Sequence, residues 1–364
     1  MKKMKQKIIS LILTVVMICA MLPVTAFASG TVAKIGDVKY ATLDEAVAAA
    51  KDGDTIELLQ DATTNGLNLS KDLTIRAAAG LSQKPTVTFT QYGIALWGKA
   101  LTFKDCNVVM DGIGSTPYTG EWNWMSICAS KDASLTLDNV NMTMDAEGTT
   151  NSPHAIYFCN NNVLNLVNGT SLTIKNYAND ALEWDGGNGG YNVNITDSTF
   201  VSDHNRSGFT GTFYATITDS DVDVINSTGN GSNGSHFIIT NSNVNFSDNG
   251  SHGLSAGELI IDSSVVTTNN NHGMGITVNN NFTVENSSKV TVTGNADNSS
   301  YGYAAVRLYN NYNFTVDGTS TLHINDNNNT GLYVRQGSLT VEDGADLEIM
   351  GNKVSNDLLD GYGG

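Results

Sequence analysis

The chain repeats one short pattern of apolar and polar residues. Two or three apolar or β-branched residues alternate with others and lead to an Asp or Asn beside a small residue, as in LTLDNV and VNITDS. A second alternating stretch usually follows, such as Val222–Val224. The Asp and Asn positions are Asp105, Asn139, Asn168, Asp197, Asp219, Asn241, Asp262, Asn286, Asp317 and Asp343. Their spacing, about 21 to 34 residues, is typical of a solenoid.

Each repeat predicts three short strands. In one repeat these are residues 181–185, 191–196 and 199–202, with a Gly-rich turn after the first and the Asp197-Ser198 corner after the second. Alternation with a period of two turns one side of each strand inward. Asp and Asn suit the corners because they tolerate left-handed backbone angles.

Stacking such coils predicts an all-β fold, a right-handed single-stranded parallel β-helix of about 11 coils. A single coil cannot bury its apolar side, whereas the stack forms one continuous core. An antiparallel sandwich is the alternative. It would show hairpin turns and no fixed corner column.

The N-terminus has the features of an export signal. Lys2, Lys3, Lys5 and Lys7 precede an apolar stretch, residues 8–22, and Ala26-Phe27-Ala28 is a small-x-small cleavage site. Residues 1–28 are therefore predicted to be a signal peptide, with an uncleaved membrane anchor as the alternative. No second long apolar stretch follows. We expect a secreted or cell-surface protein with no membrane span after cleavage.

Residues 29–63 are predicted to form an N-terminal cap of strand, helix and strand. Thr42-Leu43-Asp44-Glu45 reads as a capping box, a helix continues from Ala46 to Lys51, and Gly53 ends it. The stretch AKIGDVKYATLDEAVAAAKDGDTIELLQDAT resembles the opening of clostridial-type surface proteins with a right-handed, pectate-lyase-like β-helix. Residues 64–364 would form the β-helix itself. Because no capping helix or sorting motif follows a new coil at residues 356–362, we expect a truncated C-terminus and a larger parent chain.

Charge narrows the choice of partners. Signal cleavage removes four of the 19 basic residues and none of the 36 acidic ones, which leaves 15 basic residues and a formal net charge of −21. Such a surface repels nucleic acid and anionic lipid. It also repels polyuronates unless a cation bridges them. The spacing of Cys106, Cys128 and Cys159 matches no zinc pattern. No cofactor is required, although Ca²⁺ binding is possible.

Aligning the strand before each corner predicts two outward columns on one sheet. The resemblance implies that this sheet lines the substrate cleft in enzymes of that fold. One column is Ala95, Ser126, Tyr157, Glu183, Thr210, Ser255, Gly275, Arg307 and Tyr333. The other is Trp97, Cys128, Cys159, Asp185, Thr212, Gly257, Thr277, Tyr309 and Arg335. Cys128 and Cys159 would then be about 5 Å apart on adjacent coils, as a pair of thiols or, after oxidation, a disulfide.

An acidic group on this sheet is the main candidate for chemistry. Glu183 and Asp185 are two residues apart on one strand and would point the same way, with Asp180 and His154 beside them. Paired carboxylates suit glycoside hydrolysis, so the candidate catalytic residues are Glu183, Asp185, Asp180 and His154. Asp180, Glu183 and Asp185 suit a calcium site equally well. A solvated acidic face with no specific chemistry is the third interpretation.

Aromatic and Arg side chains are the candidates for ligand binding, because aromatic rings stack on sugar faces and Arg favours interfaces. These candidates are Trp97, Trp122, Trp124, Tyr157, Arg206, Arg307, Tyr309, Tyr333 and Arg335. Loop packing against the barrel is the alternative for the aromatics. We expect adhesion or binding of a polysaccharide or host cell-surface glycan through the lateral faces. The rival hypothesis is a polysaccharide lyase or glycoside hydrolase with a cleft around Glu183 and Asp185.

Overall fold

The computed structural model describes residues 30–117, 124–149, 153–159, 161–184, 190–296 and 304–353. The predicted signal peptide and the predicted coil at residues 356–362 lie outside these ranges. The described residues from Val32 onward form one compact unit. Within the described residues, no helix has the length and apolar character needed to cross a membrane.

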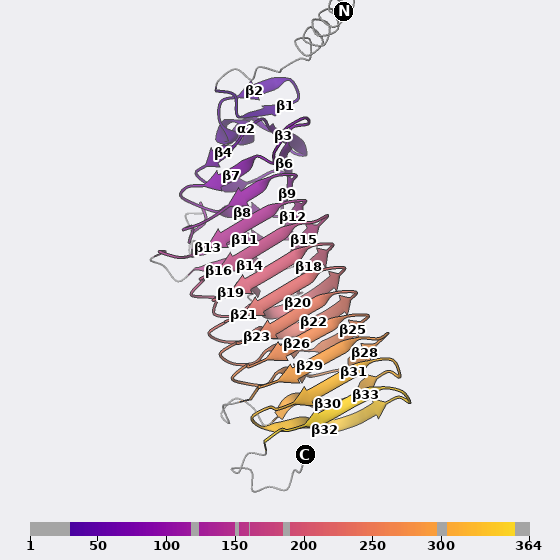
Figure 1. Ribbon diagram of the computed structural model, residues 1–364. Coiled ribbons are helices and arrows are strands. Elements are labelled where there is room, and N and C mark those ends of the chain that lie inside the picture. The colour runs from indigo at the N-terminus through magenta and orange to yellow at the C-terminus, as the bar shows by residue number, and fades with distance from the viewer. Residues whose placement is uncertain are drawn as a thin grey trace, which may run out of the picture. The chain divides into compact units, whose positions relative to one another are not determined.

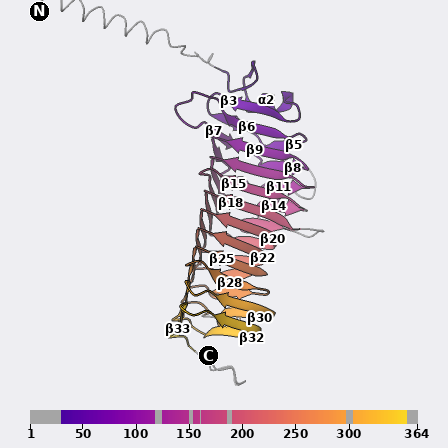
Figure 2. The same ribbon diagram turned by 90° about the vertical axis from the view of Figure 1, so that its right-hand side faces the viewer.

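The compact unit is a parallel β-helix of about 11 coils, which confirms the predicted fold class. One coil contains β14 (His154–Cys159), β15 (Val163–Val167) and β16 (Ser171–Lys175). Each of the three pairs in parallel with its counterparts in the coils before and after. Rungs therefore stack in chain order, as Figures 1 and 2 show. Among the described strands of the stack, pairing runs between coils and not through hairpins, which excludes the sandwich.

The strands form three lateral faces. The first face contains β5 (Leu67–Leu69), β8 (Ile94–Trp97), β11 (Met125–Ser130), β14, β17 (Leu182–Trp184), β24 (Leu254–Ala256) and β27 (Ile276–Val278). The second face contains β3 (Asp54–Leu58), β6 (Leu73–Ala77), β9 (Ala100–Lys104), β12 (Ser134–Asp138), β15, β18 (Tyr191–Thr196), β25 (Glu258–Asp262) and β28 (Phe282–Glu285). Four long strands run from the first face into the second: β20 (Phe209–Thr218), β22 (Ser232–Thr240), β30 (Ala304–Val316) and β32 (Thr330–Val341).

Within the described residues, the third face is a sheet of 12 strands in unbroken order. Its strands are β4 (Ala62–Thr64), β7 (Thr86–Phe89), β10 (Asn107–Val109), β13 (Asn141–Asp145), β16, β19 (Thr199–Asp203), β21 (Asp221–Ile225), β23 (Asn243–Ser247), β26 (Val265–Asn269), β29 (Lys289–Thr293), β31 (Thr321–Asn325) and β33 (Asp346–Met350).

Two stacked glycines let β20 and β22 pass from one face to the next. Gly211 pairs with Gly234. Their φ angles are 95° and 156°, which side chains rarely adopt. A Cβ on Gly234 would lie 1.9 Å from the carbonyl oxygen of Gly211. The corner therefore requires both the conformational freedom of glycine and its lack of a side chain.

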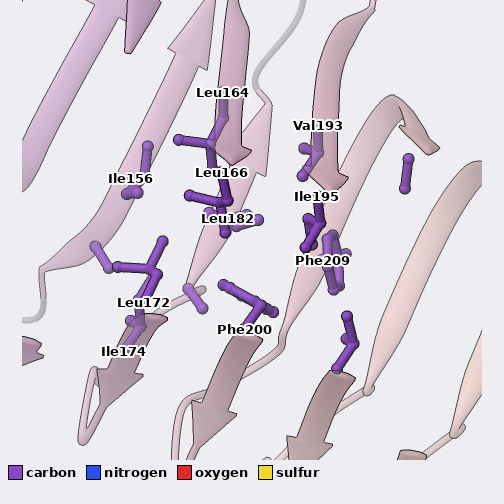
Figure 3. Packing of buried hydrophobic residues seen from close by; sticks show 14 of the residues in the cluster. Ile156, Leu164, Leu166, Leu172, Ile174, Leu182, Val193, Ile195, Phe200 and Phe209 are labelled. Atoms are coloured by element: carbon purple, nitrogen blue, oxygen red, sulfur yellow. The ribbon is translucent and has the colours of Figure 1, made fainter. Parts of the chain in front are cut away.

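Alternate residues of all three faces fill one apolar core (Figure 3). Ile156 stacks on Leu182 from the first face, and Leu164 stacks on Val193 from the second. Leu172 completes the rung from the third face, and all five side chains are fully buried. Burying such a side chain stabilises the fold by about 1.5–3 kcal/mol. Stacking like residues in columns repeats this contribution in every coil.

The corner between the second and third faces confirms most of the predicted Asp/Asn column. Asp105, Asn139, Asn168, Asp197, Asp219, Asn241 and Asn286 all have left-handed φ angles between 47° and 57°. The predicted positions of Asp262 and Asp317 are wrong by one residue. Asp262 pairs with Thr240, and the corner residue of that coil is Ser263, with φ 51°. Asp317 follows Val316, and Val316 pairs with Val284. Asp317 therefore lies level with Glu285, one residue before the corner residue Asn286.

Two buried polar ladders lie directly inside the corners. The Ser198 N–H donates to the Ser220 hydroxyl, and the same bond links Ser220 to Ser242, Ser242 to Ser264, and Ser264 to Ser288. At the end of the third face, Asn249, Asn271, Asn295, Asn327 and Asn352 form a second ladder. Sequence reasoning missed this second ladder. Both ladders satisfy backbone N–H groups that the turns would otherwise leave buried and unpaired.

The N-terminal cap differs in detail from the prediction. A hairpin of β1 (Ala33–Ile35) and β2 (Val38–Tyr40), rather than one strand, precedes the helix α2 (Leu43–Ala49). Thr42 Oγ1 accepts a 3.1 Å hydrogen bond from the Glu45 N–H, as a capping box requires. The helix ends two residues earlier than predicted, because Ala50 is extended. Leu43 and Ala46 are buried in the common core.

Stability is expected to fall as the pH drops from about 5 to about 2. Partial burial tends to raise the pKa of Asp317, but hydrogen bonds from Ser320, the Asn286 N–H and Thr319 lower it from 3.8 to about 2. A carboxyl with a lowered pKa in the folded state stabilises above its unfolded pKa, and this stability is lost as the pH falls through the folded value. Urea unfolding at several pH values should show a shallower acid slope for Asp317→Asn. An unchanged slope would contradict this assignment.

Candidate functional site

Four polar side chains from neighbouring coils meet on the first face. His154 begins β14, Glu183 lies on β17, and Asp180 and Arg206 belong to the segments that lead into β17 and β20. The Ala155 N–H donates to the carbonyl of Asp180, which fixes the register between the two coils. We call His154, Asp180, Glu183 and Arg206 the histidine–carboxylate cluster.

His154 and Glu183 form the first pair of the cluster. The Nδ1 atom of His154 contacts Oε2 of Glu183. His154 is only 6% exposed, and the Glu183 side chain is 17% exposed. A carboxylate facing Nδ1 favours a proton on that nitrogen, which leaves Nε2 as the basic atom of the neutral ring. The pair therefore has the parts of an oriented general base.

Asp180 and Arg206 form the second pair. Arg206 Nε donates to Asp180 Oδ1 over 2.9 Å, and its Nη2 donates to Oδ2. Asp180 is fully buried, whereas the Arg206 side chain is 47% exposed. The hydrogen bond from Arg206 to Asp180 raises the pKa of Arg206 above its ordinary value. This two-point contact holds the guanidinium plane in one orientation.

Aromatic rings border the cluster on one side. The Trp124 ring lies edge-on to His154, with centroids 4.9 Å apart, and to Tyr157 at 5.4 Å. Tyr157 is fully buried, but Trp124 is 37% exposed. Trp97 and Cys159 pack against Met125, Cys128 and Tyr157 in an apolar group separate from the main core. The cluster thus adjoins an accessible indole ring supported by buried aromatic and sulfur-containing side chains.

The structure brings together some, but not all, of the predicted catalytic and metal-binding residues. It brings His154, Asp180 and Glu183 together, with ligand atoms within 4.8 Å of one another. Asp185 and Trp122 lie outside the described residues. Arg206 bonds both oxygens of Asp180, so this carboxylate is committed to a protein partner. Calcium takes six to eight oxygen ligands, and the described cluster by itself provides too few.

A second group of predicted residues lies farther along the first face. The Arg307 guanidinium carbon is 3.7 Å from the Tyr309 ring centroid and 5.7 Å from that of Tyr333. Arg307 pairs in register with Thr277 on one side and Tyr333 on the other. Arg335 is exposed two residues beyond Tyr333. The Arg307 guanidinium is therefore in cation–π contact with the tyrosine rings beside it.

The predicted outward columns are wrong for one coil near the cluster, that of β11, and for one farther along, that of β27. Cys128, not Ser126, pairs with Tyr157, and Cys159 pairs with Ser130. Arg307 pairs with Thr277 rather than Gly275. Cys128 and Cys159 are thus diagonal neighbours, offset by one strand spacing of about 4.8 Å and two residues of about 3.3 Å each. That separation exceeds the reach of a disulfide, and neither cysteine forms one.

Alternation breaks at the start of β11, although the register between β11 and β14 is the same from the Met125–His154 pair to the Ser130–Cys159 pair. Ser126 turns inward there and bonds the carbonyl of Ile113 and the hydroxyl of Tyr177. Sequence alternation carried no signal for this step. Sequence reasoning also missed the contact between Arg206 and Asp180, because the two residues are 26 positions apart and no local pattern links them.

No family model matches the sequence, and no curated protein is similar to it. Among solved structures, the periplasmic alginate epimerase AlgG has 7% identity and a TM-score of 0.38, with 81% of this chain and 85% of that chain covered. The A-module of the mannuronan C-5 epimerase AlgE6 of Azotobacter vinelandii has 11% identity and a TM-score of 0.37, covering 83% and 92%.

The GH136 lacto-N-biosidase of Eubacterium ramulus has 10% identity and a TM-score of 0.38, covering 80% of this chain and 60% of that chain. Likenesses this distant carry no argument about activity. The fold assignment rests on the strand pairings of the chain itself.

Proposed function

We propose that the chain is an exported cell-surface protein that binds a glycan on its first face, at the histidine–carboxylate cluster. The observation that carries the proposal is the half-accessible Trp124 ring beside oriented polar groups. Sugar recognition combines an aromatic surface for the apolar side of a pyranose with a few fixed hydrogen-bonding groups. The cluster provides both within one stretch of the face.

Arg206 is the best-oriented donor of this site. A guanidinium has five N–H donors, and Asp180 accepts from its Nε and Nη2 atoms. The exposed part of the side chain leaves further donors at the surface in a fixed direction. Because Asp180 holds the group, a ligand would not have to order a flexible side chain, which lowers the entropic cost of binding.

Catalysis is the second candidate function, and the His154–Glu183 pair is the observation that favours it. Glu183 orients the imidazole, so Nε2 could remove or return a proton on a bound sugar. A hydrolase would also need a second carboxylate at a suitable distance. Asp180 is committed to Arg206, so that role would pass to Asp185, which lies outside the described residues. Binding without turnover therefore needs fewer additional assumptions.

The proposed partner is a polysaccharide or a host cell-surface glycan. The mature charge of −21 opposes nucleic acid and anionic lipid. Export rests on the sequence of residues 1–28 alone and stays a prediction. Calcium binding also stays a prediction, and it would require Asp185 or ligand oxygens in addition to Glu183.

The binding proposal predicts that Trp124→Ala weakens the affinity for the ligand at least about tenfold, or about 1.4 kcal/mol. A glycan array would identify the ligand, and titration calorimetry would measure its Kd. Tyr92→Ala is the matched control, because Tyr92 is a similarly exposed ring at 36%. Equal affinity of Trp124→Ala and the native chain would refute the site.

Reducing-sugar and double-bond assays on pectins, host glycans and xylans separate binding from catalysis. Turnover that disappears in Glu183→Gln would establish an enzyme. Binding that persists in both Glu183→Gln and Asp185→Asn, without turnover in the native chain, would exclude one.

A further inference from the structure

An uncharged surface occupies the middle of the second face, and the proposed function does not use it. Three neighbouring strands, β18, β20 and β22, each present three outward residues in register. These form the columns Asn192–Tyr214–His236, Asn194–Thr216–Ile238 and Thr196–Thr218–Thr240. The residues between them, such as Val193, Ala215 and Phe237, are buried in the core. We call these nine outward residues the uncharged platform.

The platform exposes large apolar groups in a regular arrangement. Tyr214 is 47% exposed and Ile238 is 43% exposed. The Tyr214 ring stacks on the His236 ring, with centroids 4.8 Å apart and planes 21° from parallel. The two rings therefore pack against each other across adjacent coils and form one aromatic group at the surface. Exposed apolar side chains gathered in this way mark an interaction site more often than scattered ones do.

The charge pattern limits the partner. None of the nine residues is Asp, Glu, Lys or Arg, although the mature chain carries a net charge of −21. Charges lie at two of the platform's borders. Asp197 and Asp219 follow Thr196 and Thr218 at the corner, and in the next coil Glu258 pairs with His236 and Asp262 pairs with Thr240. Covering the platform would desolvate hydroxyl, amide and ring groups but no ion, so the cost is low for a neutral partner. A polyanion would find no positive charge on the platform. A polycation would pair with the acidic residues that border the platform and not with the platform itself.

The geometry fits an extended sugar chain. Successive rungs are about 4.8 Å apart, which is close to the advance of one residue in an extended β-linked polysaccharide. Pyranose rings could pack against the exposed apolar parts of Tyr214 and Ile238, while hydroxyl groups bond Thr216, Thr218 and Asn194. Asn194 is already aligned by a 2.9 Å bond from its Nδ2 atom to Asn165 Oδ1 in the preceding coil.

We infer that the uncharged platform is a second binding site, and that it takes a neutral, extended polysaccharide whose chain runs along the stacking direction of the coils. This inference depends on the proposed function only because both sites would bind carbohydrate. The first-face site is centred on charged groups and Trp124. The platform is uncharged and centred on Tyr214, so each can fail without the other.

The test titrates cellohexaose, xylohexaose and mannohexaose, with hexagalacturonate as the charged comparison, into the full mature chain. At least one neutral hexasaccharide is expected to bind, with little change in Kd when salt is raised. Tyr214→Ala should weaken that binding at least about tenfold, and Tyr214→Phe should retain it. Thr216→Arg, which places a long charged side chain in the centre, should also abolish it. Trp124→Ala should leave it unchanged.

Tyr312→Ala is the matched control, since Tyr312 is 41% exposed and lies on β30, away from the platform. Binding of no neutral hexasaccharide would overturn the inference, as would equal losses in Tyr214→Ala and Tyr312→Ala. Loss in Trp124→Ala but not in Tyr214→Ala would support the first-face site and reject the platform. Self-association that depends on Tyr214 in sedimentation experiments, without sugar binding, would assign the surface to a protein contact and reject the inference.

Discussion

Asn271→Ala is expected to lower the free energy of unfolding by about 4 kcal/mol. The Asn271 side chain is fully buried. Its oxygen accepts from the N–H and Nδ2 groups of Asn249, and its Nδ2 group donates to the Phe246 carbonyl and to Asn295 Oδ1. Alanine would leave several of these partners buried without a hydrogen bond, and each such group costs about 1–3 kcal/mol.

The neighbouring residue provides the control for this variant. Asn270 also donates an amide hydrogen bond between coils, to Asp248 over 3.2 Å, but at the exposed surface. Its φ angle is 53°, so Asn270→Gly removes the amide while keeping a suitable backbone. We expect a loss within about 0.5 kcal/mol for Asn270→Gly. Urea unfolding of both variants measures the difference. A similar small loss in Asn271→Ala would show that the buried ladder contributes little.

Arg206→Ala is expected to cost about 3 kcal/mol of unfolding free energy. Asp180 is fully buried, and Arg206 supplies the two hydrogen bonds to its two oxygens. Removing the guanidinium would leave a buried carboxylate without its counter-charge, which is the costly way to break a buried ion pair. The first-face ligand site would be affected as well, because the same guanidinium is its oriented donor.

Arg76→Ala is a closely matched control. The Arg76 side chain is 45% exposed and pairs with Glu57, whose side chain is 15% exposed. Because Glu57 also pairs with Lys34, it keeps a counter-charge when Arg76 is removed. A loss below about 1 kcal/mol is expected. The double variant Arg206→Leu with Asp180→Asn should recover part of the loss, since it removes both charges. Thermal unfolding that ranks Arg76→Ala as the worse variant would contradict the assigned roles.

The two pairs of the cluster suggest a division of labour on the first face. Asp180 is buried and satisfied, so its effect on a ligand passes through the orientation of Arg206. Glu183 is more accessible and faces His154, so it can respond to a bound ligand directly. Substitutions at Asp180 should therefore change stability and affinity together, whereas Glu183→Gln should change binding or turnover with a smaller effect on stability.

Individual strands show how far local pattern reaches. The strand predicted at residues 191–196 is found as β18 over the same residues, and the strand predicted at 199–202 is one residue longer as β19. The preceding strand, β17, begins at Leu182, one residue later than predicted, and its predicted last residue, Asp185, lies outside the described residues. Alternation identifies the inward residues of a regular strand because its period is two. It does not fix the alignment between coils, so the prediction placed β11 two residues out of register with β14, and it does not show that Ser126 is buried.

The candidate site shows the same limit. Glu183, Asp180, His154 and Arg206 were all predicted from their residue types and their approximate positions in successive repeats. Their pairing was not, because Arg206 and Asp180 are 26 residues apart and meet only through the stacking of coils. The Tyr214–His236 stack has the same origin: the two residues belong to different coils and become neighbours only in register.

The sequence by itself determined the repeat, the three strands of each coil, most left-handed corners and the helix start at Thr42. These depend on interactions within a few residues and on the period of a strand. The tertiary structure decided which residues of one coil lie beside which residues of the next, and thereby the ion pairs, the buried asparagine ladder and the uncharged platform. The reason is that the turns between strands vary in length and shape, so hydrogen bonding between whole coils, rather than local preference, sets the register.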